Sequence, residues 1–324
     1  MSADGMEHIS CNLCGSNRSK LMFRRRDTRF LVSNKAFAVV KCLQCSLVYV
    51  NPRPTEKEIR DYYTDEFYQA ELSPEQALEC NRGRIEAMYH HVQHLPSGRV
   101  LDIGCYKGEF LYFMRTKGWT VSGLEFYSRP PNLFDLNIHY GEIENAAFEP
   151  NSFDLITMWA VLEHVYNPKR TLALVRGLLR PTGRLVLLVP NFSSIPARFM
   201  RHDDVPRHTT MFTRPTLTEM LTITGYRVNT VECGQDVYSG SIRGVLNFLV
   251  KRLAGEGFDT ILQQNRRAER WQEFAGQLRG RESRLMERVD RLDQAITPFF
   301  DRWLDRLGLG FIMVVEAEPI PLSN

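Results

Sequence analysis

The stretch Val100-Leu-Asp-Ile-Gly-Cys-Tyr-Lys-Gly-Glu-Phe110 decides the fold of this chain. Its first half is an apolar run that predicts a buried strand, and its two glycines predict a tight turn that leads into a helix. A strand that passes through such a turn into a helix is the usual ligand-binding position in a doubly wound sheet. The segment therefore predicts an α/β fold with a ligand site at this turn.

The sequence on the C-terminal side of this stretch repeats the alternation of strand and helix. Helical patterns are expected at 109–117, 168–179 and 215–224. Apolar strand-like runs are expected at 99–104, 119–125, 137–142, 153–159, 184–190, 227–233 and 311–317. Alternating strands and helices predict a doubly wound, Rossmann-like parallel sheet with right-handed crossovers.

Changes in composition along the chain divide it into five parts. We expect a zinc-ribbon-like module at 1–50, a helical linker or lid at 51–98, and a sheet core at 99–240. A helical insertion at 241–307 and a final core strand with a tail at 308–324 complete the chain.

Length and charge exclude several classes of protein. The 324 residues, 43% of them hydrophobic, are enough for a sizeable core and do not suit a disordered or membrane-spanning chain. A net charge of +3 is too small to indicate a nucleic-acid partner. The dense basic run Arg24, Arg25, Arg26 and Arg29 is typical of a solvated surface. The N-terminus lacks the pattern of a secretory signal, so a cytoplasmic location is expected.

Two Cys-x-x-Cys pairs stand near the N-terminus, Cys11 with Cys14 and Cys42 with Cys45. Each pair can place two thiolates on one ion, and two pairs complete a closed tetrahedral zinc site. The alternatives are four buried thiols or a redox pair, but neither pair opens a helix inside a βαβ unit. Because four thiolates leave no open coordination position, the expected zinc is structural.

The glycine turn is unlike a dinucleotide loop. Its pattern is Asp102-x-Gly104-x-x-x-Gly108 and not G-x-G-x-x-G, and the carboxylate at the strand end would repel a pyrophosphate. The same carboxylate suits a ligand that carries an ammonium and a sulfonium charge, as S-adenosylmethionine does. Glu125 ends the next strand, where an acid can accept hydrogen bonds from both ribose hydroxyls.

At this point the chain resembles the class I S-adenosylmethionine-dependent methyltransferases over about residues 99–235. LDIGCYKGEF is similar to the first motif of that family, and FDLITMWAVLEHVYNP followed by LLRPTGRLVLLVPN is similar to its fourth and fifth strands. The N-terminal CLQCSLVYVNPRPTEKEIRDYY and the later RHTTMFTRPTLTEML resemble a zinc-ribbon subgroup that is often found in bacterial carbohydrate or natural-product pathways. Tyr106 departs from the family pattern, which has a small residue there.

The resemblance, added to the residue chemistry, gives a set of expected cofactor-binding residues. They are Asp102, Gly104, Cys105, Gly108, Glu125, Glu142, Trp159 and Ala160. The resemblance implies that Glu142 meets the adenine amino group and that Trp159 and Ala160 line the cofactor after the fourth strand. For Trp159, packing in the core is the alternative.

Two histidines are candidates for acid–base catalysis, because imidazole titrates near working pH. His164 lies in the LEHV segment, where it could instead pack beneath the site, and His208 lies in a loop after the fifth strand. The same loop holds Arg201, His202 and Arg207, which could bind an anionic substrate group or be solvated. Tyr62, Tyr63 and Tyr68 could cover the pocket or pack in a core.

The function expected from these features is transfer of a methyl group from S-adenosylmethionine to an O, N or C nucleophile of a small metabolite, such as a sugar or natural product. The alternatives are an RNA base methyltransferase and a non-catalytic protein that keeps the fold. Apolar residues spaced at sevens in the helical segment raise the option of a homodimer helix, against a helix that packs on the sheet domain: Trp271, Leu278, Leu285, Leu292 and Phe299.

Overall fold

The computed structural model describes residues 5–27, 29–63, 73–126, 132–195, 197, 204–234, 237, 245–253, 255 and 284–321. Its centre is a seven-stranded sheet with the strand order β12-β13-β10-β9-β6-β7-β8. The strands of this sheet are β6 (Arg99–Ile103), β7 (Thr120–Glu125), β8 (Ile138–Tyr140), β9 (Phe153–Trp159), β10 (Leu179–Pro190), β12 (Tyr226–Gly234) and β13 (Ile312–Pro319).

All strands of this sheet run in the same direction except β13, the last strand in the sequence. β6 pairs in parallel with β7 and β9, and β9 pairs in parallel with β10. β13 runs antiparallel between β10 and β12, so the last strand does return to the main sheet as expected. The parallel strands end at one edge, with the turn after β6 at its middle, which is where such folds bind ligands.

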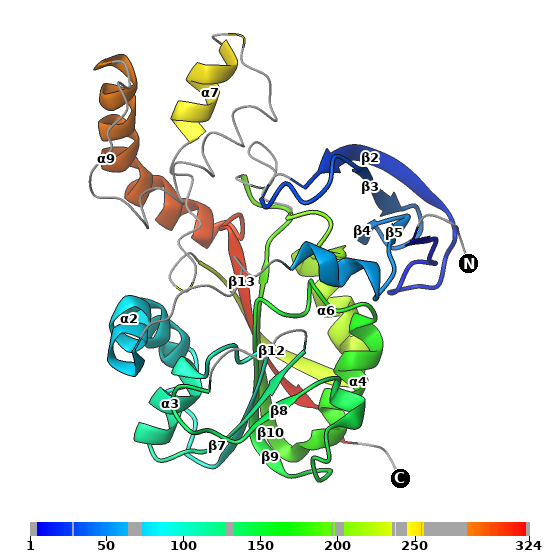
Figure 1. Ribbon diagram of the computed structural model, residues 1–324, viewed down its shortest axis with the longest axis vertical. Helices are drawn as coiled ribbons and strands as arrows, with labels where there is room; N and C mark the ends of the chain where they lie inside the picture. The colour runs from blue at the N-terminus through cyan, green and yellow to red at the C-terminus, as the bar shows by residue number, and fades with distance from the viewer. Residues whose placement is uncertain are drawn as a thin grey trace.

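Helices cover both faces of the sheet, which makes three layers (Figure 1). α2 (Pro74–His90) and α3 (Glu109–Thr116) lie on one face, and α4 (Pro168–Leu178) and α6 (Arg214–Ile223) lie on the other. α4 begins as its sequence predicts, with Pro168 in the first turn and the Asn167 side chain accepting a hydrogen bond from the Arg170 amide. The middle of β10, from Leu185 to Val189, is fully buried because both faces are covered.

The N-terminal part forms a smaller sheet of four strands in the order β11-β4-β3-β2. Three of them come from the N-terminus, β2 (Ser19–Arg26), β3 (Ala36–Cys42) and β4 (Val48–Val50). The fourth, β11 (Thr210–Met211), comes from the loop after β10 and pairs antiparallel with β4. Short elements complete this region: β1 (Met6–Glu7), β5 (Arg53–Pro54), the 3-10 turn η1 (Glu58–Tyr62) and, beside β8, η2 (Ile143–Asn145).

The N-terminal module, residues 5–63 as described, shares a hydrophobic core with the main sheet. One cluster of buried residues contains Cys11, Leu13 and Leu47 of the module together with Leu101 and Phe212. Arg53 donates a hydrogen bond to the Tyr166 carbonyl (2.7 Å), and Tyr166 Oη donates to the Pro54 carbonyl (2.7 Å). The module is therefore packed against the core and not merely tethered to it.

Of the expected helical insertion, the structure describes α7 (Val245–Leu253) and α9 (Arg284–Arg306), which contact each other. Leu292 and Phe299 are exposed on α9, whereas Trp271 and Leu278 lie outside the described residues. The dimer helix therefore stays a prediction. Among the helices that the structure describes, none combines the length and apolar character needed to cross a membrane.

Candidate functional site

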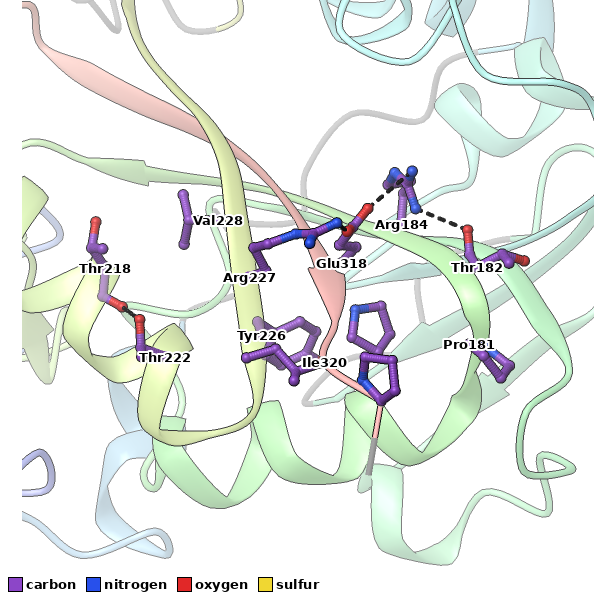
Figure 2. Close-up of a pocket in the computed structure, with 12 residues that line it drawn as sticks. Pro181, Thr182, Arg184, Thr218, Thr222, Tyr226, Arg227, Val228, Glu318 and Ile320 are labelled. Carbon is purple, nitrogen blue, oxygen red and sulfur yellow. Dashed lines mark hydrogen bonds and ion pairs between the residues drawn. The ribbon is translucent and has the colours of Figure 1, made fainter. Parts of the chain in front are cut away.

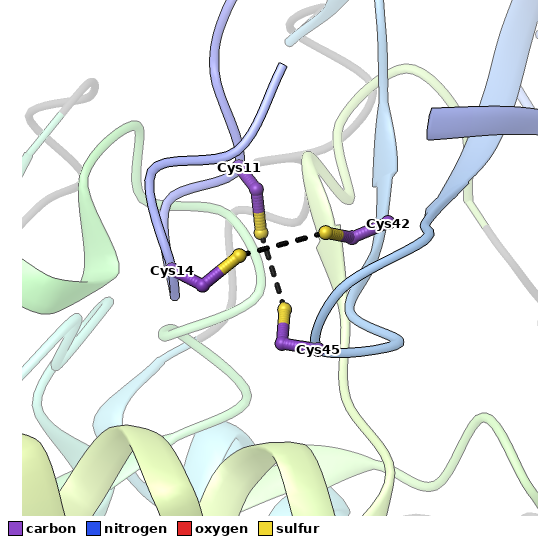
Figure 3. A group of neighbouring side chains, drawn as sticks. All are labelled: Cys11, Cys14, Cys42 and Cys45. Atoms are coloured by element: carbon purple, nitrogen blue, oxygen red, sulfur yellow. Dashed lines mark hydrogen bonds between the residues drawn. The ribbon is translucent and has the colours of Figure 1, made fainter. Parts of the chain in front are cut away.

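The four cysteines predicted to bind zinc converge on one point (Figure 3). Cys11 Sγ lies 3.4 Å from Cys45 Sγ, and Cys14 Sγ lies 3.5 Å from Cys42 Sγ. All four sulfur atoms lie within 4.8 Å of one another. Four sulfurs at about 2.3 Å from a central ion would stand roughly 3.8 Å apart, so the cluster has almost the size that tetrahedral zinc requires.

The turn after β6 adopts the strained geometry that its glycines allow. Gly104 has φ +74°, and a Cβ atom on it would lie 2.4 Å from Val161 Cγ2. Tyr106, with φ +51°, also takes a left-handed conformation, and its amide donates a hydrogen bond to Glu125 Oε2 (2.8 Å). The Glu125 carboxylate at the end of β7 thus helps to fix the turn and faces the same space.

A cavity of about 790 Å³ opens at the carboxyl ends of β6, β7 and β9. Seven of the eight expected cofactor residues line it, namely Asp102, Gly104, Cys105, Glu125, Glu142, Trp159 and Ala160. The volume lies in the range of cofactor-sized pockets, about 300–1,000 Å³. The structure therefore brings the predicted residues together around a space that suits an S-adenosylmethionine molecule.

Gly108 is the member of the predicted set that does not line this cavity. It caps α3 with φ +86°, and a Cβ on it would lie 2.5 Å from Leu136 Cδ1. The glycine is thus needed for backbone conformation and for close packing beneath the turn. Its contact with the cofactor stays a prediction.

Buried acids give the cavity its electrostatic character. Burial, with a smaller contribution from the nearby Glu125, raises the pKa of Asp102 to about 8, although a hydrogen bond from Thr157 Oγ1 (2.6 Å) acts in the opposite direction. Burial also raises the pKa of Glu109 and of Glu142. Carboxylates that are costly to ionise together would be stabilised by a cation between them. The lining therefore fits a ligand with positive charge.

A second cluster of titratable groups lies beside this cavity. His164, in the turn after β9, lines the cavity, and its Nδ1 is 3.0 Å from Tyr63 Oη. His208 does not line the cavity, but its ring packs edge-on against that of His164, with centroids 4.6 Å apart. Glu163 Oε1 is 4.0 Å from His164 Nε2. We call Glu163, His164 and His208 the histidine cluster.

Burial keeps the three side chains of the histidine cluster uncharged at neutral pH. Burial lowers the pKa of His164 to about 4 and holds that of His208 well below its ordinary value, so both imidazoles are neutral at neutral pH. Burial raises the pKa of Glu163 to about 8, and neither of its carboxyl oxygens has a hydrogen-bond partner in the described structure. The three side chains also place ligand atoms within 4.8 Å of one another, a spacing that could hold a metal ion.

The structure corrects the expectation for Arg207. Its side chain is fully buried and forms ion pairs with Asp27 (2.8 Å) and Asp204 (2.7 Å), so it is not available to an anionic substrate. Arg201, His202 and Tyr68 lie outside the described residues. In the basic run expected to be solvated, Arg25 is buried.

Sequence reasoning missed some positions that line or adjoin the cavity. Arg29 lines the 790 Å³ cavity, although its run of arginines suggested only solvated surface. Tyr63, which was expected either to cover the pocket or to pack in a core, lines the same cavity. Glu163 directly precedes His164, and an acid beside a candidate base was the available signal.

Another cavity, of about 660 Å³, lies at the opposite end of the sheet (Figure 2). Thr182 and Arg184, in the first half of β10, and Glu318, near the end of β13, line it. Its charged groups pair with one another, since Glu318 accepts from both Arg227 and Arg184. This pairing leaves little charge for a ligand, so the cavity beside the glycine turn is the stronger candidate.

Comparisons with known proteins agree with this site. Residues 75–231 match a family model described as a methyltransferase domain. The chain is 35% identical over 115 residues to the ubiquinone biosynthesis O-methyltransferase of Paraburkholderia phymatum. The aligned region covers 32% of this chain and 49% of that protein. It is 33% identical over 100 residues to the enzyme of the same name from Burkholderia thailandensis, covering 28% and 43%. The chain spans about half the length of these curated relatives.

A solved structure, a SAM-dependent methyltransferase from Archaeoglobus fulgidus, is 19% identical, with 74% of this chain and 97% of that chain covered and a TM-score of 0.43. The family match spans the glycine turn, the acid at the end of β7 and the histidine after β9. Residues 75–231 are therefore similar to a methyltransferase domain.

Replacing Glu125 tests the ribose assignment. We expect Glu125→Gln to weaken S-adenosylmethionine binding by about 1.5–3 kcal/mol, roughly 10- to 150-fold, because charge-assisted hydrogen bonds become neutral ones. Glutamine keeps an acceptor oxygen for the Tyr106 amide, so the turn stays formed. Isothermal calorimetry measures the change, with Glu219→Gln on the exposed face of α6 as the control. If the variant binds the cofactor as tightly as the native protein does, Glu125 does not bind the ribose hydroxyls.

Proposed function

We propose that this protein transfers a methyl group from S-adenosylmethionine to an O, N or C nucleophile of a small molecule. The observation that carries the proposal is the pair of buried acids, Asp102 and Glu125, at the ends of adjacent strands around a 790 Å³ cavity. The relatives are named as enzymes of ubiquinone biosynthesis, which is consistent with methylation of a small-molecule oxygen.

Each half of the cavity has a separate task in this proposal. Asp102, Glu125 and Glu142 hold the cofactor, whose sulfonium supplies an already activated methyl group when bound. The Gly104 turn leaves room for the methionine part, and Trp159 forms an apolar wall. Catalysis is then mostly alignment of the acceptor with the methyl group.

His164 is the group we assign to removal of the acceptor proton. Its side chain reaches the cavity, and its low pKa keeps the imidazole in the neutral form that can accept a proton. The adjacent Glu163 is protonated at neutral pH because of its raised pKa. An imidazolium close by would lower that pKa, and Glu163 could then stabilise the charge as a carboxylate. His208 supports the ring of His164 and is the second candidate for the proton.

A third part of the proposal is a structural zinc ion held by Cys11, Cys14, Cys42 and Cys45. The size of the cysteine cluster and the chemistry of four thiolates support it. The module also brings Tyr63 to the cavity, so its folding is coupled to the site.

The experiment that tests this function starts from methyl-labelled cofactor. Purified protein is incubated with pools of small molecules, and mass spectrometry identifies which compound gains the label. Methylated RNA in place of a metabolite would favour the RNA alternative, and cofactor binding without turnover on any pool would favour the non-catalytic one. Elemental analysis should give one zinc per chain, and a second metal equivalent would assign the histidine cluster to metal binding.

Once the acceptor is known, we expect His164→Ala to lower kcat by about 10²–10⁴-fold with cofactor affinity unchanged, as loss of a general base does. His208→Ala should lower kcat less, because His208 does not line the cavity. The native kcat should stay level from neutral pH down to about pH 5 and fall below it, since His164 gains a proton only as pH falls through its pKa of about 4. Steady-state kinetics across pH measure both effects.

The control for these variants is His94→Ala, because His94 is exposed and lies outside the cavity. If His164→Ala retains full turnover across pH, proton removal is not its role and alignment alone remains.

A further inference from the structure

A buried network of ion pairs connects the N-terminal module to the loop of His208. At its centre Arg207 donates hydrogen bonds to Asp27 Oδ1 (2.8 Å), Asp204 Oδ1 (2.7 Å) and the Tyr62 carbonyl (2.9 Å). Asp27 and Tyr62 belong to the module, and Asp204 lies four residues before His208. Because Arg207 and Asp27 are both fully buried, neither can exchange its partner for water.

The module holds its side of the network rigidly. The Asp27 carboxylate also accepts hydrogen bonds from the backbone amides of Arg29 (3.0 Å), Phe30 (3.2 Å) and Val32 (3.2 Å), which fixes its direction. The side chain of Arg29 then reaches Asp204 Oδ2 at 3.0 Å. Asp204 is thus held by one guanidinium from its own loop and by another from the module.

From Asp204 the contacts continue to the cavity. The Asp204 carbonyl oxygen accepts a hydrogen bond from the His208 backbone amide (3.1 Å), and Asp204 Oδ2 lies 4.0 Å from His208 Nε2. The His208 ring packs on His164, which lines the cavity. A continuous series of contacts therefore runs from Asp27 and Arg29 to the imidazole that faces the acceptor.

We propose that Asp27 and Arg29 are positioning residues for the His164–His208 pair, so that the N-terminal module supplies part of the acceptor side of the site. This inference rests on the proposed function, in which His164 takes the acceptor proton. The module then acts through Asp204 and Arg207 without touching the reacting atoms itself.

The charges around His208 give this inference its measurable consequence. Asp204, Arg29, Arg207, His164 and Glu163 are the charged or titratable groups that face it. Burial is the largest cause of its lowered pKa; Arg29 and Arg207 lower it as well, and Asp204 raises it. Arg29 also lowers the pKa of His164. Loss of the Arg29 charge should therefore raise the pKa of both imidazoles.

The first test compares Arg29→Gln with Arg29→Lys. Arg29 is about half exposed, so both variants should fold. We expect the glutamine variant to raise the pKa values of His164 and His208 in an NMR titration of the ring resonances, and the lysine variant to restore them towards the native values. A purely structural role would change stability and leave the kcat of the folded protein with the identified acceptor unchanged. Unchanged titrations in Arg29→Gln would overturn the inference for Arg29.

The second test uses Asp27→Asn and is read with the identified acceptor. We expect kcat to fall by about 10- to 100-fold, as misplacement by about 1 Å can produce, with KM and cofactor affinity within twofold. If Asp27→Asn fails to fold, Arg29→Gln gives the same kinetic readout with a smaller fall. A rise in KM alone would instead place Arg29, which lines the cavity, in direct contact with the acceptor.

These outcomes separate the inference from the proposed function. Full turnover in His164→Ala would reject the assignment of the base and leave the titrations as the only evidence on Arg29. Loss of turnover in His164→Ala together with native kinetics in both Asp27→Asn and Arg29→Gln would keep the function and reject the positioning role.

Discussion

Of the substitutions considered, Cys42→Ser is expected to cause the largest loss of stability. Cys42 is buried in the core that the module shares with the main sheet, and its amide donates to the Leu47 carbonyl (2.8 Å) where the chain turns towards β4. Structural zinc contributes about 10–16 kcal/mol to the folding of small zinc domains. Even a partial loss of that free energy is large beside the usual 5–15 kcal/mol of a folded protein.

We therefore expect Cys42→Ser to lower the melting temperature by about 10 °C or more and to bring zinc below one equivalent per chain. Differential scanning calorimetry and elemental analysis measure the two effects. Cys80→Ser is the matched control, because Cys80 is exposed on α2 and lies outside the cluster. A variant that melts at the native temperature without zinc would show that the cysteines stabilise the module simply as buried thiols.

Gly104→Val should abolish cofactor binding. The residue has φ +74°, where a β-branched side chain is strained, and its Cβ would lie 2.4 Å from Val161 Cγ2. The added methyl groups would also enter the cavity that Gly104 lines. Together these effects predict at least about a 100-fold loss of S-adenosylmethionine affinity in calorimetry, or about 2.7 kcal/mol.

Two further variants separate the causes of this loss. Gly177→Ala, in α4, has no neighbour within 4 Å of the new Cβ and should leave binding unchanged. Gly104→Ala combined with Val161→Ala relieves the steric contact and keeps the backbone strain. Native affinity in Gly104→Val would mean that the cofactor does not approach the turn.

Local sequence signals predicted the centre of the fold well. The apolar run before Gly104 did form β6, the following turn did lead into α3, and the two Cys-x-x-Cys pairs did converge. In each case the information lies within a few residues, because strand patterning, glycine conformation and ligand spacing are local properties. The acid at Glu125 was equally readable, since it ends the neighbouring parallel strand.

The acceptor side could not be predicted in the same way, because it depends on contacts between distant segments. Taken alone, Arg207 looks like a solvent-exposed base. Its ion pairs with two carboxylates from different parts of the chain, Asp27 and Asp204, offset the free-energy cost of burying its charge. The two-residue strand β11 carries no pattern of its own and forms because β4 offers an open edge. For Gly108 the motif did predict a special backbone, but not that Leu136 lies where a Cβ would be.

The pairing of β11 with β4 also affects the order in which the chain can fold as it is synthesised. Residues 5–63 are synthesised before residues 210 and 211, so the side of β4 that faces away from β3 has no partner strand until β11 has emerged. Until then this edge is open to association with other chains. Asp27 likewise has no Arg207 to pair with, because that residue lies 180 positions further along the chain. Completion of the N-terminal sheet is therefore a late step, coupled to the arrival of the His208 loop.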